Sequence, residues 1–230
     1  MAEQAPHADG GDLGRRFTRL VQVIAVLRER CPWTAALTHQ SLLEYLIEES
    51  YEVVEAVETG HTGPSDAEEL AGELGDVLFQ VLLHARLQAE SGHFGIGEVV
   101  DSLTAKMIRR NPHVFAPDGS LRAGTTGDTA EIEGAWDAVK KREKPGRASP
   151  FDGIPAGLPA LLLAAKTQDR ARRAGLDVPA AAPGTTAERT WQGQAELGDH
   201  LFDVVRQAQA QGLDAEAALR AAVRRFTAGR

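Results

Sequence analysis

Residues 41–57, SLLEYLIEESYEVVEAV, decide the fold class of this chain, because their apolar side chains recur at helical spacing. Three acidic residues, Glu48, Glu49 and Glu52, lie in the middle of this stretch. Residues three or four apart are neighbours on the surface of a helix, so these carboxylates can project together. The stretch therefore predicts a helix that carries an acidic cluster.

A second acidic pair, Glu73 and Asp76, follows after a gap of twenty residues and belongs to another helical stretch, 67–83. Both acids flank an apolar stripe of period near 3.6, which indicates a groove or an interface instead of bulk water. The stripe consists of Leu70, Leu74, Val77, Leu78, Val81 and Leu82. The alternative is a solvated charged face, and we expect that for Glu55, Glu58, Glu68 and Glu69.

If the two helices pack antiparallel, four or five carboxylates meet in one groove. Such a cluster repels itself unless a cation neutralises it. Hard oxygen ligands in this number suit Mg²⁺, or Mn²⁺ as a second possibility, and these ions suit phosphate chemistry. The acids therefore predict a metal centre for a phosphate-containing substrate.

The composition narrows the class of protein further. The chain has 230 residues, of which 43% are hydrophobic and only 5% aromatic, which favours an all-α fold. A net charge of −8 argues against nucleic-acid binding. The single cysteine, Cys31, excludes an intramolecular disulfide and fits a reducing cytosol. The sequence shows neither a membrane-spanning run nor a signal peptide, so we expect a cytoplasmic protein without a membrane partner.

Breaks in the pattern divide the chain into a disordered tail (1–13), a helical catalytic module (14–143), a Pro- and Gly-rich linker (144–157) and a shorter second module (158–230). Residues 196–205 repeat residues 73–82 in type and spacing, but no Glu-Glu-x-x-Glu precedes them. We therefore expect the second copy to pack and not to catalyse. The expected helices include Arg16–Glu29, one with Thr38 as its N-cap, Gly97–Arg110, Glu131–Lys141, Leu158–Ala174 and a region that starts near Glu188.

The pattern Glu-Glu-x-x-Glu, twenty residues, Glu-x-x-Asp resembles the signature of the MazG family of all-α nucleoside triphosphate pyrophosphohydrolases. Further similar segments are Cys31-Pro32-Trp33, residues 110–115 (RNPHVF), Trp136 with Lys140, and residues 154–161. The resemblance covers nearly the whole chain after about residue 16, as a double-domain member with a shortened, degenerate second copy. Thr34 departs from the family, which usually has Asp at this place.

This resemblance implies hydrolysis of an NTP between its α- and β-phosphates, to NMP and pyrophosphate, by a tight homodimer. The residue chemistry agrees, because Mg²⁺ held by Glu49, Glu52, Glu73 and Asp76 can neutralise developing charge on phosphate oxygens. Glu48 is a candidate to orient or deprotonate the attacking water, or to bind a second metal. The competing hypothesis is a non-catalytic module that binds a nucleotide or a partner protein.

Basic residues are expected to receive the triphosphate. Lys106, Arg109 and Arg110 share one helical face, and similarity to the family places this segment against the nucleotide. Trp136 and Lys140, four residues apart, are candidates for base stacking and phosphate contact. Their alternative is ordinary helix packing with an exposed lysine.

Two histidines near the acidic clusters, His39 and His84, are interpreted as packed or surface residues instead of ligands. Glu90 and His93 form a Glu-x-x-His element typical of di-iron bundles, but it crosses a glycine break and has no second copy. We therefore discount a di-iron centre.

Overall fold

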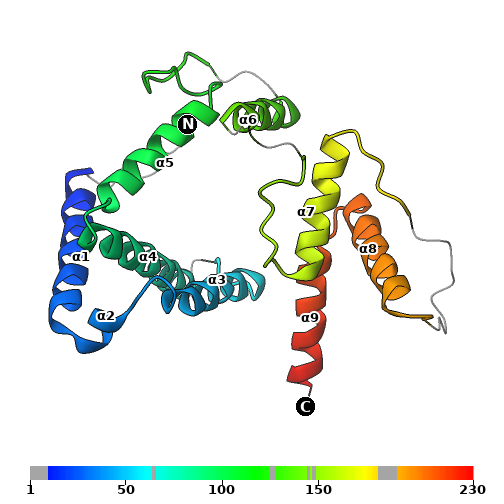
Figure 1. Cartoon of the computed structure of the whole chain (residues 1–230), viewed down its shortest axis with the longest axis horizontal. Coiled ribbons are helices and arrows are strands. Elements are labelled where there is room, and N and C mark those ends of the chain that lie inside the picture. Colours follow the sequence, from blue (N-terminus) through cyan, green and yellow to red (C-terminus); the bar gives the residue numbers. More distant parts are fainter. Residues whose placement is uncertain are drawn as a thin grey trace. The chain divides into compact units, whose positions relative to one another are not determined.

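A computed structural model describes residues 10–63, 66–124, 128–143, 146, 149–180 and 191–229. These residues form an all-α protein, as predicted, with an isolated bridge between Phe115 and Leu121 as the β pairing among them (Figure 1). The helices are α1 (Gly10–Arg30), α2 (Pro32–Ala36), α3 (Leu42–Glu58), α4 (Ala67–Glu90), α5 (Ile96–Arg110), α6 (Thr129–Glu143), α7 (Ala160–Arg173), α8 (Gln194–Ala210) and α9 (Ala215–Ala228).

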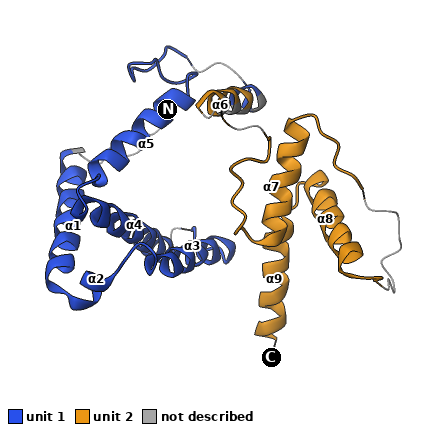
Figure 2. Cartoon of the chain, in the orientation of Figure 1, with its two compact units in different colours: residues 1–132 blue, residues 133–230 orange. Residues whose placement is uncertain are grey.

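The chain divides into two compact units, residues 1–132 and residues 133–230 (Figure 2). The first contains α1 to α5, and α3 packs most extensively on α4. The second contains α7, α8 and α9, which all pack against one another. Helix α6 spans the boundary between the units. No helix in the described ranges combines the length and the apolar character needed to cross a membrane.

Several helix ends differ from the sequence-based expectations. Helix α1 begins at Gly10, so the tail expected over 1–13 is wrong for its last residues, and residues 1–9 lie outside the described part. Helix α3 begins at Leu42 with Ser41 as its N-cap, whereas we expected Thr38. The hydroxyl groups of Thr38 and Ser41 each accept from the other's backbone N–H, which closes a turn before the helix starts.

The last helical region also begins later than expected. Helix α8 starts at Gln194 after Gly193, while Glu188 lies outside the described residues. Gly193, the N-cap of α8, has φ of 151°, a conformation that L side chains rarely adopt, so glycine is suited to this position.

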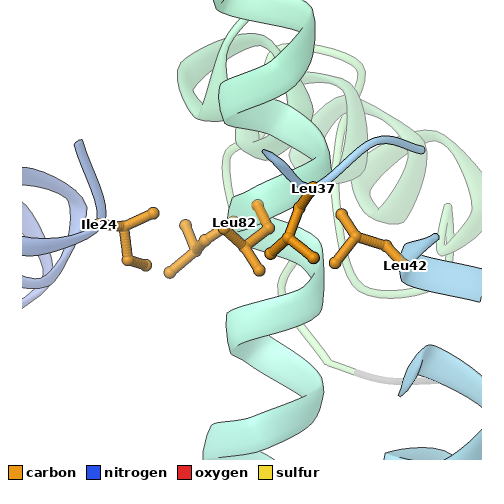
Figure 3. Packing of buried hydrophobic residues seen from close by; sticks show 5 residues of the cluster. Ile24, Leu37, Leu42 and Leu82 are labelled. Atoms are coloured by element: carbon orange, nitrogen blue, oxygen red, sulfur yellow. The ribbon is translucent and has the colours of Figure 1, made fainter. Parts of the chain in front are cut away.

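The core of the first unit lies where α1, the start of α3 with the segment before it, and α4 meet (Figure 3). Its buried residues are Ile24, Leu37, Leu42, Leu82 and Leu83. The apolar stripe predicted on α4 is only partly buried, because Leu74 and Val81 are 53% and 38% exposed. Leu83 and Phe79 belong to the core instead, since α4 packs against α1 and α5 as well as α3 and its buried face is turned toward all three.

The loop around α2 is fixed by polar contacts. Thr34 is 2% exposed, and its hydroxyl lies 2.6 Å from the carbonyl oxygen of Leu27 and 3.1 Å from that of Cys31. The guanidinium of Arg28 donates to the carbonyl oxygens of Thr34 and Leu37, and binds both carboxylate oxygens of Glu90 at 3.2 and 2.6 Å. Threonine at position 34 therefore has a structural role in this chain.

The second unit has a small core with buried polar groups. Val205 is fully buried on α8, and the buried Gln168 on α7 donates its amide to the carbonyl oxygen of Phe202 at 2.7 Å. Leu201 and Val204, also on α8, remain 45% and 40% exposed. The second unit therefore leaves an apolar face of α8 uncovered by its own helices.

Candidate active site

Helices α3 and α4 run antiparallel and bring acids from both into one cluster. Glu49, Glu52 and Glu73 each place a carboxylate oxygen within 4.8 Å of the others. Glu49 and Glu73 are half-buried and Glu52 is exposed, so the cluster opens to solvent on one side. Within the described ranges, this is the one group of three or more potential metal ligands that lie so close.

The other two predicted acids lie at the margin of this trio. Glu48 and Asp76 are exposed and are not members of the 4.8 Å group. Their charges nevertheless reach it, because both contribute to raising the pKa of Glu49. The structure therefore places all five acids in one electrostatic environment.

The carboxylates of the cluster are partly buried and repel one another, and both effects raise the pKa values of Glu49 and Glu73. Burial, a hydrogen bond with Glu52 and the charges of Asp76, Glu52 and Glu48 raise the pKa of Glu49 to about 7. Burial and the charges of Glu52 and Asp76 also raise the pKa of Glu73. A group of carboxylates that retains protons near neutrality is suited to a cation that replaces those protons.

The donor set fits a hard divalent ion. Three carboxylates converge, with a fourth from Asp76 on the next turn of α4, and every donor is oxygen. Mg²⁺ usually binds a few carboxylates and keeps room for water and substrate phosphates. The open, oxygen-only arrangement therefore fits Mg²⁺ better than a closed site of nitrogen and sulfur ligands.

The predicted basic residues fall into two groups. Lys106, Arg109 and Arg110 occupy the last turns of α5, in the same unit as the acids. Trp136 and Lys140 lie on α6, where the Lys140 ammonium is 4.6 Å from the centre of the Trp136 ring. Trp136 and Lys140 belong to the second unit, whereas the acidic cluster belongs to the first.

Comparison with known proteins shows the family. A nucleoside triphosphate pyrophosphohydrolase of Escherichia coli (strain K12) is 34% identical over 92% of this chain and 84% of its own length. A protein of Thermotoga maritima named nucleoside triphosphate pyrophosphohydrolase/pyrophosphatase MazG is likewise 34% identical, over 94% of this chain and 84% of its own. The chain belongs to the MazG family. An uncharacterised 26.1 kDa protein of Streptomyces cacaoi is 40% identical over 91% and 78%.

The MazG nucleotide pyrophosphohydrolase domain matches residues 37–115. This range contains both acidic clusters and the basic turns of α5, and it ends before Trp136 and Lys140. Family membership, which the sequence motifs indicated, is confirmed.

The repeated sequence in the second unit forms no such cluster among the residues that the structure describes. Glu196 and Asp199 on α8 correspond to Glu73 and Asp76, and the Glu196 carboxylate accepts from the backbone N–H of Gln192 at 2.8 Å. At the repeat position of Gln80, α8 carries Asp203, and both side chains are buried. Asp203 is held by Arg206 at 2.7 Å and Gln207 at 2.8 Å within its own helix.

The sequence interpretation missed a polar cluster beside the acids. His39 and His84 stack with ring centroids 5.0 Å apart and an angle of 11° between their planes. The sequence feature that could have predicted this pair is its spacing from the acids. His39 precedes Glu49 by ten residues, and His84 follows Glu73 by eleven. His39 lies in the turn just before α3 and His84 on α4, so the antiparallel packing that brings Glu49 to Glu73 also brings that turn to His84.

Proposed function

We propose that this protein is a Mg²⁺-dependent nucleoside triphosphate pyrophosphohydrolase that cleaves the bond between the α- and β-phosphates, giving NMP and pyrophosphate. The observation that carries this proposal is the convergence of Glu49, Glu52 and Glu73 within 4.8 Å. Mn²⁺ is the alternative ion, because it shares the preference for oxygen ligands.

Glu49, Glu52, Glu73 and Asp76 are the proposed ligands, supplied in pairs by α3 and α4. The bound ion would neutralise charge that develops on the phosphate oxygens. A carboxylate must be deprotonated to bind the ion. Because the pKa values of Glu49 and Glu73 are raised, binding of the ion would release protons from these two residues.

Glu48 is the proposed base, because it is exposed and adjacent to the ligands without being one of the converging trio. It would orient the attacking water and accept its proton as the new phosphorus–oxygen bond forms. The bond from the α-phosphorus to the bridging oxygen breaks, and pyrophosphate leaves with the electron pair. A role for Glu48 in holding a second ion is the alternative assignment.

The basic residues would bind the anionic part of the substrate. Lys106, Arg109 and Arg110 carry positive charge on the final turns of α5 and are proposed to contact the phosphates. Trp136 is proposed to stack on the substrate and Lys140 to contact a phosphate. Their cation–π contact supports a paired role, since it holds the two side chains together.

We also propose that the protein acts as a homodimer. Helix α3 exposes Leu43, Ile47 and Tyr51 at 44%, 60% and 42%, spaced four residues apart along one face. A face of this kind beside the acids is suited to packing against a second copy.

Product analysis tests the function. Purified protein would be incubated with each NTP and dNTP, with and without Mg²⁺, beside the variants Glu52→Gln and Glu55→Gln. We expect wild type and Glu55→Gln to release NMP and pyrophosphate only with the ion. Glu52→Gln should lose about a hundredfold or more in kcat, because it removes a carboxylate from the cluster.

Two other results would contradict the proposal. Release of NDP and orthophosphate would show that a different bond is cleaved. Binding of nucleotides without turnover, in saturating Mg²⁺, would favour a non-catalytic binding module.

A further inference from the structure

The guanidinium of Arg28, in the last turn of α1, connects three parts of the first unit. Its side chain is only 8% exposed. The Nη1 group donates to the carbonyl oxygens of Thr34 and Leu37, the latter at 3.2 Å. Nε and Nη2 donate to the two carboxylate oxygens of Glu90 at 3.2 and 2.6 Å. One buried side chain therefore joins α1, the end of α4 and the α1–α3 connection, which is residues 31–41.

The pairing of Arg28 with Glu90 is an ion pair with a defined orientation. The hydrogen bond from Arg28, together with the bond from Arg86 and the charges of both, lowers the pKa of Glu90 more than burial raises it. The carboxylate is therefore charged at neutral pH. Because both of its oxygens are bound by one planar guanidinium, the pair fixes an angle as well as a distance.

The α1–α3 connection is attached to α4 at two further places. Leu37 and Leu42 belong to the same buried cluster as Leu82 of α4 (Figure 3). The Nδ1 atom of His39 is 2.7 Å from the Nδ1 atom of His84, also on α4. The position of the chain against α4 is thus set by the point where α3 begins.

The direction in which α3 starts decides where its acids lie. Glu49 is two helical turns beyond Leu42, which is a rise of about 10 Å. A change of about 10° in the direction of α3 at Leu42 would move Glu49 by about 2 Å over this rise. Ligand distances in a metal site are held within about 0.2 Å. The convergence of Glu49 and Glu52 with Glu73 therefore depends on how the start of α3 is held.

We propose that Arg28 is a positioning residue for the metal site. By holding the carbonyl oxygens of Thr34 and Leu37 in a fixed relation to Glu90, it sets the direction of α3 against α4 and so the spacing of their acids. The inference rests on the proposed function, because it takes these acids as ligands of a divalent ion. Arg28 acts through the α1–α3 connection and not by contact with the ion.

Two variants of Arg28 and one control test this role. Arg28→Met keeps an unbranched apolar side chain but removes every donor. Arg28→Lys keeps the charge but cannot bind both carboxylate oxygens as a fork. Arg86→Gln is the matched control, because Arg86 binds the same Glu90 at 2.9 Å from one turn away on α4 itself. Its removal leaves the contacts of the α1–α3 connection in place.

The measurement is ion affinity, at a temperature at which circular dichroism shows each variant folded. Calorimetry would follow binding of Mg²⁺ and of Mn²⁺ without nucleotide, and activity would be recorded against Mg²⁺ concentration. We expect Arg28→Met to weaken ion binding about tenfold, as loss of an outer-shell contact does, and Arg28→Lys to weaken it less. Excess Mg²⁺ should return kcat to within about twofold of wild type. Arg86→Gln should bind the ion like wild type.

Unchanged ion affinity in Arg28→Met, with only a lower thermal midpoint, would overturn the inference, because Arg28 would then support the fold alone. Equal weakening by Arg86→Gln would overturn it too. If Arg28→Met does not fold, Arg28→Lys decides by the same two results. Absence of ion binding by the wild type would instead refute the proposed function, on which the inference rests.

Discussion

The carboxylate of Glu49 makes stability depend on pH in an unusual direction. Its folded-state pKa is about 7, above the ordinary value of 4.5, so the folded state holds the proton more tightly than the unfolded state does. The resulting contribution is fully present below pH 4.5 and is lost as pH rises through 7. We expect the thermal midpoint of metal-free protein to fall between pH 6 and 8, and Glu49→Gln to reduce this fall.

Circular dichroism melts in EDTA and in Mg²⁺ would check this expectation. The ion should restore the midpoint at pH 8 and have little effect at pH 5.5, where protons occupy the site. A midpoint that rises with pH to the same extent in wild type and Glu49→Gln would contradict the electrostatic account.

Thr34 provides a second prediction for a single residue. Thr34→Val keeps the shape of the side chain but removes the buried hydroxyl that bonds to the carbonyl oxygens of Leu27 and Cys31. We expect a loss of about 1–2 kcal/mol in the free energy of unfolding. Thr18→Val is the control, because the Thr18 hydroxyl bonds to the carbonyl oxygen of Gly14 on an exposed surface. Equal effects of the two changes in urea denaturation would refute the role of burial.

Sequence spacing identified the acids but not the histidines. Glu49 and Glu52 are linked by the period of one helix, so their proximity is a local property. His39 lies in the turn before α3 and His84 on α4, so only the tertiary packing brings them together. Thr34 is similar, because its contacts come from the way the chain folds back after α1. These features require the tertiary structure.

At the scale of elements, the N-cap of α9 gives a prediction. The Asp214 carboxylate accepts from the backbone N–H groups of Glu216 and Ala217 at the start of α9. We expect Asp214→Ala to reduce the free energy of unfolding by about 1 kcal/mol, because it removes this acceptor. Asp214→Asn is the control and should cost much less, because it keeps a side-chain oxygen. Chemical denaturation would measure both, and equal effects of the two changes would contradict the capping role.

The helices themselves were predictable, whereas their exact faces and ends were not. The period of apolar residues indicated α1, α3 and α4, and each of these helices contributes buried residues to the core of the first unit. The buried face of α4 is rotated from the predicted stripe, since three other helices share it. Thr38 and Ser41 both have hydroxyl groups that can accept from a backbone N–H. The sequence alone therefore did not distinguish Ser41, the N-cap of α3, from Thr38.

At the scale of the whole molecule, we expect a homodimer that depends on the exposed face of α3. Ile47→Arg would place a charge on the most exposed apolar residue of that face and should shift the protein toward a monomer. Leu121→Arg is the control, because Leu121 is 77% exposed in the segment after α5. Sedimentation equilibrium would measure both. A monomeric wild type, or equal effects of the two variants, would contradict this expectation.

The antiparallel register of α3 and α4 has a consequence for changes of chain length. The acidic cluster joins α3 to α4, and the histidine pair joins α4 to the turn just before α3. Insertion of one residue between Leu46 and Glu49 would turn the following side chains by about 100° relative to those before it. The two pairings could then not both be kept. We therefore expect an insertion in this part of α3 to disturb the site more than a substitution at an exposed position.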